Sequence, residues 1–256
     1  MLSRALRDIR DGLLGLAYPE RCRICSAAVE SWDDGIACAV CWDDPNVTKL
    51  LTGSVCTKCG LPLTRLMLDS KPAPRNDGPR LCGTCASFPF TSARAAGIYS
   101  GALEANVLFL KVTPHICSRL RVIICKTVSD HRDALASEIV VPVPLHHLRE
   151  RQRGFNQAAI IARLISREFK LRLDERSLLR TRPTERHRAG MDAAERAHSV
   201  ERAFEVMRPR LIDGASVLLV DDVYTTGSTI CAATQKLIEA GARQVTVLTI
   251  ARVGEK

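Results

Sequence analysis

Apolar and polar residues follow one another in two kinds of segment along the C-terminal two thirds of the chain. Short, nearly continuous apolar runs are typical of buried strands, and apolar residues spaced three or four apart indicate helices packed on a core. Strands that alternate with helices favour parallel crossover connections, so we expect an α/β domain from about residue 95 to residue 256. The predicted strands are 138–144, 216–220 and 244–250, and the predicted helices are 155–169 and 229–240.

The N-terminal third shows a different pattern of apolar and polar residues. Residues 2–16 show an amphipathic helical pattern, with charges of both signs on its polar side. Mixed charge favours docking on the rest of the protein, or on a partner, over lying on a membrane surface. Residues 20–90 contain few periodic segments, and a loop rich in Pro, Asn and Asp is expected at 69–79. Residues 105–112 fit either the end of a helix or an apolar strand.

Composition places the chain among ordinary globular proteins. Of its 256 residues, 46% are hydrophobic and 25% are charged, which excludes a disordered chain. No run of 18 apolar residues exists, and charges interrupt the N-terminal apolar stretch, so we expect a cytoplasmic protein without a transmembrane helix. The formal net charge of +9 is typical of a protein with an anionic partner.

Cysteine spacing indicates bound metal. Eight of the 11 cysteines form C-x-x-C pairs, and two such pairs supply the four thiolates of a tetrahedral zinc site. Closed sites of this kind stabilise a fold, so two structural Zn²⁺ sites are predicted over a thioredoxin-like redox pair. Spacing alone leaves open whether the pairs combine sequentially or interleave. The pairs are Cys22/Cys25, Cys38/Cys41, Cys56/Cys59 and Cys82/Cys85, and the remaining Cys117, Cys125 and Cys231 are expected to be small buried residues.

The most specific chemical signal is the segment VLLVDDVYTTGST at 217–229. A buried strand is expected to end in Asp221 and Asp222, and a hydroxyl-rich loop then opens a helix. A helix N-terminus offers unpaired amides to a phosphate, and a glycine in the loop lets a ligand approach the backbone. The segment has neither the G-K-[ST] of a Walker A loop nor a G-x-G-x-x-G fingerprint. The alternative interpretation is an ordinary helix cap.

This segment resembles the 5-phosphoribosyl-1-pyrophosphate motif of type I phosphoribosyltransferases. The stretch VVPVPLHHLRERQRGFNQAAIIARLI is similar to a segment of the ComF family, whose members carry a double zinc ribbon before the transferase domain. The resemblance implies a parallel-sheet type I phosphoribosyltransferase fold of class α/β, preceded by a small Cys-rich zinc-ribbon module. Residues 1–92 would hold the amphipathic helix and the double zinc ribbon, and residues 93–256 the transferase-like domain.

The resemblance also assigns roles to residues. Asp221 and Asp222 would hold the ribose hydroxyls, and the 5′-phosphate would lie on the loop made of Thr225, Thr226, Gly227, Ser228 and Thr229. Residues 145–154 would be the pyrophosphate loop, whose guanidinium groups suit phosphate, although they also fit a solvated basic face. The arginines of that loop are Arg149, Arg151 and Arg153. Mg²⁺ is expected to bind together with the donor.

Residues 179–204 would form the loop that covers the site, and here the chain departs from the family pattern. His187 stands for Gln, Ser199 for Asn and Arg202 for Gly, whereas Arg196 and Phe204 keep their places. These departures affect the acceptor more than the donor. The histidines His146, His147 and His187 are expected to be ordinary loop residues rather than proton shuttles.

Two functions follow from the resemblance. The first is a phosphoribosyltransferase of unknown acceptor that binds phosphoribosyl pyrophosphate with Mg²⁺ and is linked to DNA uptake. The alternative is a non-catalytic adaptor that binds single-stranded DNA or DNA-uptake proteins. Between residues 140 and 210 there are 16 basic against 9 acidic residues, a surplus that suits both ligands. The sequence leaves open whether turnover occurs.

Overall fold

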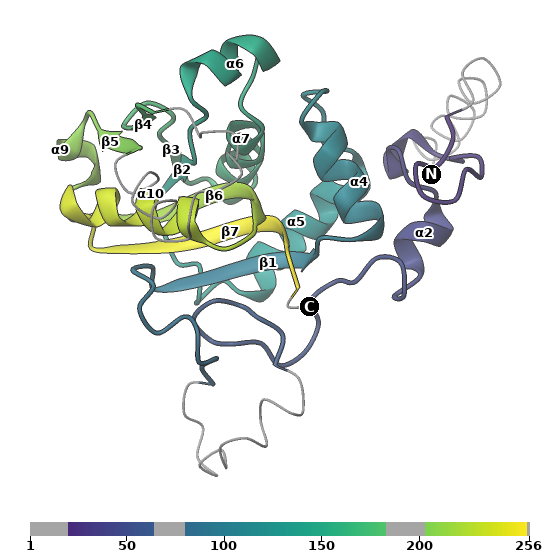
Figure 1. Ribbon diagram of the computed structural model, residues 1–256, viewed down its shortest axis with the longest axis horizontal. Helices are drawn as coiled ribbons and strands as arrows, with labels where there is room; N and C mark the ends of the chain where they lie inside the picture. The colour runs from purple at the N-terminus through teal and green to yellow at the C-terminus, as the bar shows by residue number, and fades with distance from the viewer. Residues whose placement is uncertain (1–19, 64–79, 183–202, 255–256) are drawn as a thin grey trace, which may run out of the picture.

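The computed structural model describes residues 20–63, 80–182 and 203–254. Its centre is a five-stranded sheet of order β1-β7-β6-β2-β3, in which every neighbouring pair is parallel (Figure 1). The predicted helix at 2–16 and the predicted loop at 69–79 lie outside the described residues. The strands are β1 (Ser92–Ile98), β2 (Ile139–Pro142), β3 (Arg172–Leu173), β6 (Ser216–Tyr224) and β7 (Gln244–Arg252).

Helices cover both faces of this sheet. On β6, Val217 and Leu219 face a core shared with α10 (Ser228–Glu239), whereas Leu218 and Val220 face the opposite core. All four side chains are fully buried, which explains why the strand reads as a continuous apolar run. The expected α/β class with a parallel sheet is thereby confirmed. The helices on the opposite face are α4 (Gly101–Leu110), α5 (Ser118–Asp130) and α7 (Gln157–Phe169).

The observed end of strand β6 differs from the predicted one. Strand β6 does not end before Asp221 but continues to Tyr224, because β7 pairs with it along its whole length, up to Tyr224 opposite Arg252. The two carboxylates are therefore held by a sheet rather than by a loop. The segment 105–112, left open between helix and strand, belongs to helix α4.

Several elements carry too weak a sequence signal to be predicted. Strand β1 reads SARAAGI, a run of small residues that shows neither an apolar block nor an alternation. The antiparallel pair β4 (Leu178–Arg180) and β5 (Phe204–Val206) is only three residues long on each side. The other short elements are η1 (Trp32–Asp34), α2 (Ala39–Asp43), α6 (His147–Arg153) and α9 (Pro209–Ile212).

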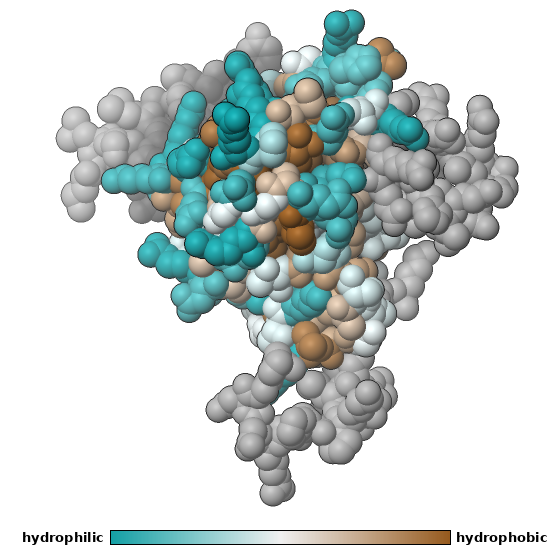
Figure 2. All heavy atoms as spheres, turned by 90° about the vertical axis from the view of Figure 1, so that its left-hand side faces the viewer, coloured by the Kyte–Doolittle hydropathy of each residue, from teal (hydrophilic) through white to brown (hydrophobic). Residues whose placement is uncertain are grey.

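Strands β4 and β5 lie with α9 at one side of the molecule, beside α10 (Figure 1). Seen from this side, hydrophobic side chains reach the surface among hydrophilic ones (Figure 2). Leu179, Met207 and Leu211, from this group of elements, are each exposed by more than a third. The small pair thus presents a partly apolar surface next to the end of the main sheet.

The Cys-rich module lies along the free edge of β1. Backbone hydrogen bonds join Leu51 N to Ala96 O at 3.0 Å and Ile98 N to Lys49 O at 2.8 Å. A third runs from Ala93 N to Lys58 O at 2.6 Å. These bonds satisfy an edge strand that would otherwise invite pairing with another chain. In the described part of the chain, no helix combines the length and the apolar character needed to cross a bilayer.

Candidate phosphate site and zinc centres

The topology of the sheet places a switch point between β6 and β2. The chain leaves β6 through α10 toward β7, and it leaves β2 through α7 toward β3, in the opposite direction. Ligands of open parallel sheets bind at the carboxyl ends of two strands that diverge in this way. The segment after β6 is the hydroxyl-rich loop, and the segment after β2 is the arginine-rich stretch, so both predicted motifs meet at this point.

The hydroxyl-rich loop turns sharply into α10. Gly227 caps the helix with a φ of 82°, a left-handed conformation that favours glycine. The Thr226 and Ser228 hydroxyls lie 2.7 Å apart, and both residues are exposed, as is Thr225. Thr229 is half-buried in the first turn. The loop therefore presents hydroxyl groups and the amino end of a twelve-residue helix at the carboxyl end of β6.

Asp222 is buried and anchored by residues from two helices. Its Oδ2 atom lies 3.6 Å from Lys111 Nζ, at the end of α4, and accepts a hydrogen bond of 3.2 Å from Gln157 Nε2 at the start of α7. Gln157 in turn accepts a hydrogen bond from the Arg153 guanidinium. A chain of contacts thus links an arginine of the predicted pyrophosphate loop to a predicted ribose-binding carboxylate.

Asp221 lies beside Asp222 in a different environment. Burial raises the pKa of its carboxyl well above the ordinary value, and the charge of Asp222 raises it further, while Arg180 opposes the shift. Its Oδ1 atom accepts a hydrogen bond of 2.8 Å from the Asp222 amide. Carboxylate oxygens are ligands suited to a hard divalent cation. Successive residues of a strand point to opposite faces, so each carboxylate by itself, rather than the pair, fits Mg²⁺ as a ligand.

The stretch 145–154 folds mostly as helix α6, which Gly154 ends with a φ of 82°. Arg149 and Arg151 are exposed, and neither forms an ion pair with any described residue. Arg153 turns inward to Gln157. Two of the three predicted arginines are therefore open to an anion, and the third supports Asp222.

Arg180 is a basic residue of the site that sequence reasoning missed. It ends β4, pairs with His146 in an isolated bridge, and lies with its guanidinium 5.1 Å from the Phe204 ring centre. Burial lowers its pKa and the charge of Arg149 lowers it further, whereas Asp221 opposes this. A lone arginine in a short segment gives no sequence signal, because β4 is located only by its pairing with β5.

Two of the three histidines of the predicted loops lie at the start of α6. His146 Nδ1 accepts a hydrogen bond of 3.4 Å from the Leu148 amide and so caps α6, and its ring lies 4.1 Å from that of His147. His187 lies outside the described residues, as do Arg196, Ser199 and Arg202. Phe204 is buried under Arg180.

The eight paired cysteines gather into two groups, and within each group the sulfur atoms lie within 4.8 Å of one another. Sulfur separations of 3.6 Å (Cys25–Cys38), 3.5 Å (Cys56–Cys85) and 3.4 Å (Cys59–Cys82) are close to the ~3.8 Å expected of thiolates around one tetrahedral Zn²⁺. The pairs therefore combine sequentially, which spacing could not decide. The first group is Cys22, Cys25, Cys38 and Cys41, and the second is Cys56, Cys59, Cys82 and Cys85.

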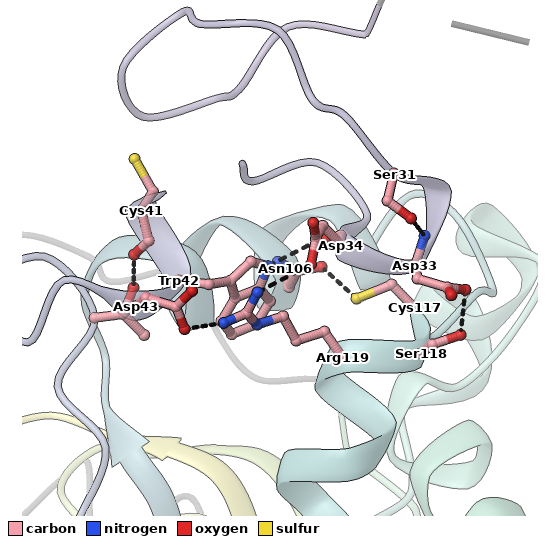
Figure 3. A network of polar contacts seen from close by, with 11 residues as sticks. Ser31, Asp33, Asp34, Cys41, Trp42, Asp43, Asn106, Cys117, Ser118 and Arg119 are labelled. Atoms are coloured by element: carbon pink, nitrogen blue, oxygen red, sulfur yellow. Dashed lines mark hydrogen bonds and ion pairs between the residues drawn. The ribbon is translucent and has the colours of Figure 1, made fainter. Parts of the chain in front are cut away.

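The first zinc ribbon docks on α4 and α5 through polar contacts (Figure 3). Arg119 of α5 lies 3.1 Å from Asp34, also pairs with Asp43, and stacks 5.7 Å from the Trp42 ring. Ser118 donates a hydrogen bond of 2.7 Å to Asp33. Matched charges thus add to the apolar packing of Trp42 in holding this ribbon.

Of the three unpaired cysteines, Cys117 is buried as expected and contacts Asn106 (Figure 3). Cys125 and Cys231 are only half-buried, because each lies on a helix side that borders solvent.

Comparison with known proteins matches both parts of the chain. Residues 13–86 match the double zinc ribbon domain family, and residues 153–256 match the phosphoribosyl transferase domain family. DNA utilization protein YhgH of Escherichia coli is 29% identical over 93% of this chain and 99% of its own length. Competence protein F of Haemophilus influenzae is 33% identical over 45% of this chain and 50% of its own. Competence protein ComFC of Bacillus subtilis is 32% identical over 44% of each.

Fold and sequence together define a protein in which a double zinc ribbon precedes a phosphoribosyl transferase domain. In this domain order the chain is similar to relatives named for DNA utilization and for competence, which agrees with the resemblance to the ComF family.

Proposed function

We propose that this protein binds phosphoribosyl pyrophosphate with Mg²⁺ at the carboxyl ends of β6 and β2, and that it serves DNA uptake. The observation that carries the proposal is the meeting of three features at one point: the loop 225–229, the carboxylates Asp221 and Asp222, and the basic residues that follow β2. A phosphate, a diol and a pyrophosphate are the three groups of this donor, and each feature suits one of them.

Each group of the donor would have its own protein partners. The 5′-phosphate would lie on the amides and hydroxyls of residues 225–229, and the ribose hydroxyls on Asp221 and Asp222. The pyrophosphate would lie near Arg149 and Arg180, whose charges have no carboxylate within 4 Å among the described residues. Mg²⁺, when bound, supplies positive charge for the departing pyrophosphate. Transfer to an acceptor would then rest on positioning and charge stabilisation rather than on a general base.

The link to DNA uptake rests on the relatives, which are named for DNA utilization and for competence. A second function is favoured by one observation, the exposed and unpaired Arg149 and Arg151 on α6. Guanidinium groups on a surface also suit the phosphodiesters of single-stranded DNA. In that case the protein would be an adaptor without turnover.

Calorimetry tests the proposal directly. Phosphoribosyl pyrophosphate is titrated, with and without Mg²⁺, into the zinc-loaded wild-type protein and into the double variant Asp221→Asn/Asp222→Asn. We expect Mg²⁺-dependent binding that weakens by about 100-fold or more in the variant, because two carboxylate contacts are lost. The matched control is Asp130→Asn, which removes an exposed carboxylate of a surface ion pair. No binding by folded wild-type protein would overturn the proposal.

Fluorescence anisotropy with a labelled single-stranded oligonucleotide separates the two functions. If the carboxyl ends of β6 and β2 form a donor site, the double variant keeps its DNA affinity while losing the donor. Equal loss of both affinities in a folded variant would contradict the assignment of Asp221 and Asp222 to ribose.

A further inference from the structure

Two arginines, one buried and one half-buried, face the second zinc ribbon without a carboxylate partner. Arg252, the last residue of β7, is only 6% exposed, and its Nη1 atom donates a hydrogen bond of 2.6 Å to the carbonyl of Cys59. Arg94 of β1 donates a hydrogen bond of 3.0 Å to the carbonyl of Thr57. Among the described residues, no carboxylate lies within 4 Å of either guanidinium, and the Nε atom of each has no hydrogen-bond partner.

A buried charge needs an opposite charge nearby, because the protein interior solvates it poorly. Four thiolates around one Zn²⁺ carry a net charge of about −2, which balances two guanidinium groups. Burial lowers the pKa of Arg94, and the charges of Cys56 and Cys59 oppose that shift. The second zinc ribbon therefore supplies the negative charge that the two arginines otherwise lack.

Arg252 also contacts the residue on which the phosphate loop rests. Its guanidinium lies 5.0 Å from the ring centre of Tyr224, which is buried and ends β6. The Tyr224 hydroxyl lies against Gly227, since a Cβ atom at that glycine would come within 2.6 Å of it. The Tyr224 carbonyl accepts a hydrogen bond of 2.8 Å from the Val253 amide. The contacts thus run from Cys59 to Arg252, to Tyr224 and to the loop.

The first zinc ribbon offers a contrast. Its arginine neighbour, Arg119, has its own carboxylate partners in Asp34 and Asp43, and these contacts lead to the start of α5 (Figure 3). No described contact joins Arg119 to the loop 225–229.

We propose that Arg252 is a positioning residue for the phosphate loop 225–229, held by the second zinc ribbon and acting through Tyr224. Zinc in the group containing Cys59 then supports the loop, whereas zinc in the group containing Cys25 does not. The ligand that the loop binds rests on the proposed function, but the positioning itself does not.

Hydrogen exchange of the amides of 224–231, measured without any ligand, tests the positioning. Arg252→Met keeps an unbranched apolar stem at this position and removes the guanidinium group with its charge. We expect loop exchange to rise about tenfold, with two zinc ions still bound, because Tyr224 loses its stacked partner. Arg252→Lys, which restores the charge, should recover part of the protection. The control Arg119→Met should leave exchange of the loop unchanged.

Wild-type exchange of the loop in a folded Arg252→Met protein with two zinc ions would overturn the proposal. If that variant does not fold, Tyr224→Leu replaces it, since this change removes the stacked ring and alters no residue of the ribbon. The loop should again exchange about tenfold faster, and unchanged protection would count against the proposal.

The role of the second ribbon is tested with one ligand cysteine from each group. Cys82→Ser should lose one zinc ion and the protection of the loop, whereas Cys25→Ser should lose one zinc ion and keep that protection. An equal response of the loop to both variants would refute the distinction.

Calorimetry with phosphoribosyl pyrophosphate is run in parallel. Faster loop exchange in a protein whose wild type binds no donor would leave the positioning intact and reject the proposed function alone.

Discussion

At the scale of single residues, the two adjacent aspartates show how one sequence motif yields two environments. Asp222 is buried against Lys111 and Gln157, which satisfy its charge. Asp221 has no described cation within 4 Å, and its pKa is raised by burial and by Asp222. A carboxylate held in this way costs stability, which is typical of a site arranged for a ligand rather than for the fold.

Asp221→Asn should therefore stabilise the protein without its ligand, in a pH-dependent way. The pKa of Asp221 is higher in the folded state than in the unfolded state, so the wild type loses stability as the pH rises through the folded pKa. Below about pH 4 both states are protonated, and the variant should gain nothing. At neutral pH we expect the melting temperature of the variant to exceed that of the wild type. Each kcal/mol of stability gained should raise the melting temperature by about 2–4 °C in a chain of this size.

Thermal melts at a series of pH values check this, with Asp222→Asn as the matched control. That variant removes a carboxylate that has a cation partner, and we expect no stabilisation from it. A lower melting temperature of Asp221→Asn at neutral pH would contradict the expectation.

At the scale of elements, the turn from β6 into α10 depends on one glycine. A Cβ atom at Gly227 meets both a left-handed backbone and the Tyr224 hydroxyl, whereas one at Gly214, with a φ of 70°, meets no atom within 4 Å. Both Gly→Ala changes should cost about 1 kcal/mol for the backbone, and Gly227→Ala should cost about 1–3 kcal/mol more for the overlap. Denaturant unfolding of the two variants measures the difference, and equal losses would argue against the close packing of Tyr224.

The docking of the first zinc ribbon on α5 also depends on contacts between elements. Arg119→Ala removes two carboxylate contacts and a ring contact from a partly buried side chain, so we expect a loss of roughly 2 kcal/mol and faster exchange of amides in 20–48. Its neighbour Arg121 makes one ion pair at an exposed position, and Arg121→Ala should cost less than about 0.5 kcal/mol. Similar losses in the two variants would mean that the contacts of Arg119 do not hold the ribbon.

At the scale of the whole molecule, the zinc centres belong to the same cores as the sheet. The second group of cysteines lies in one core with Val141 and Leu219, and Cys22, Cys38 and Cys41 lie in the other with Leu218. Metal loss should therefore weaken the whole protein rather than release a separate module. The expected division of the chain into domains 1–92 and 93–256 stays a prediction.

Metal analysis should give two zinc ions per chain, and removal with a strong chelator should lower the melting temperature by roughly 10 °C or more. Added zinc, but not magnesium, should restore the original value. A melting temperature that does not respond to chelation would show that the cysteines do not hold metal.

Local pattern in the sequence determined much of this protein. The three predicted strands, the two predicted helices 155–169 and 229–240, and the C-x-x-C turns are all predicted from neighbouring residues, since burial and turn geometry act over short stretches. The hydroxyl-rich loop 225–229 was predicted in the same way.

Only the tertiary structure decided which distant residues meet. It combined the cysteine pairs sequentially, brought Lys111, Gln157 and Arg180 to the two aspartates, and set Arg252 between a zinc ribbon and Tyr224 beside the loop 225–229. It also extended β6 past the carboxylates, because pairing with β7 outweighs the polarity of that segment. Such choices depend on strand order and packing across the chain, and no local pattern of residues records them.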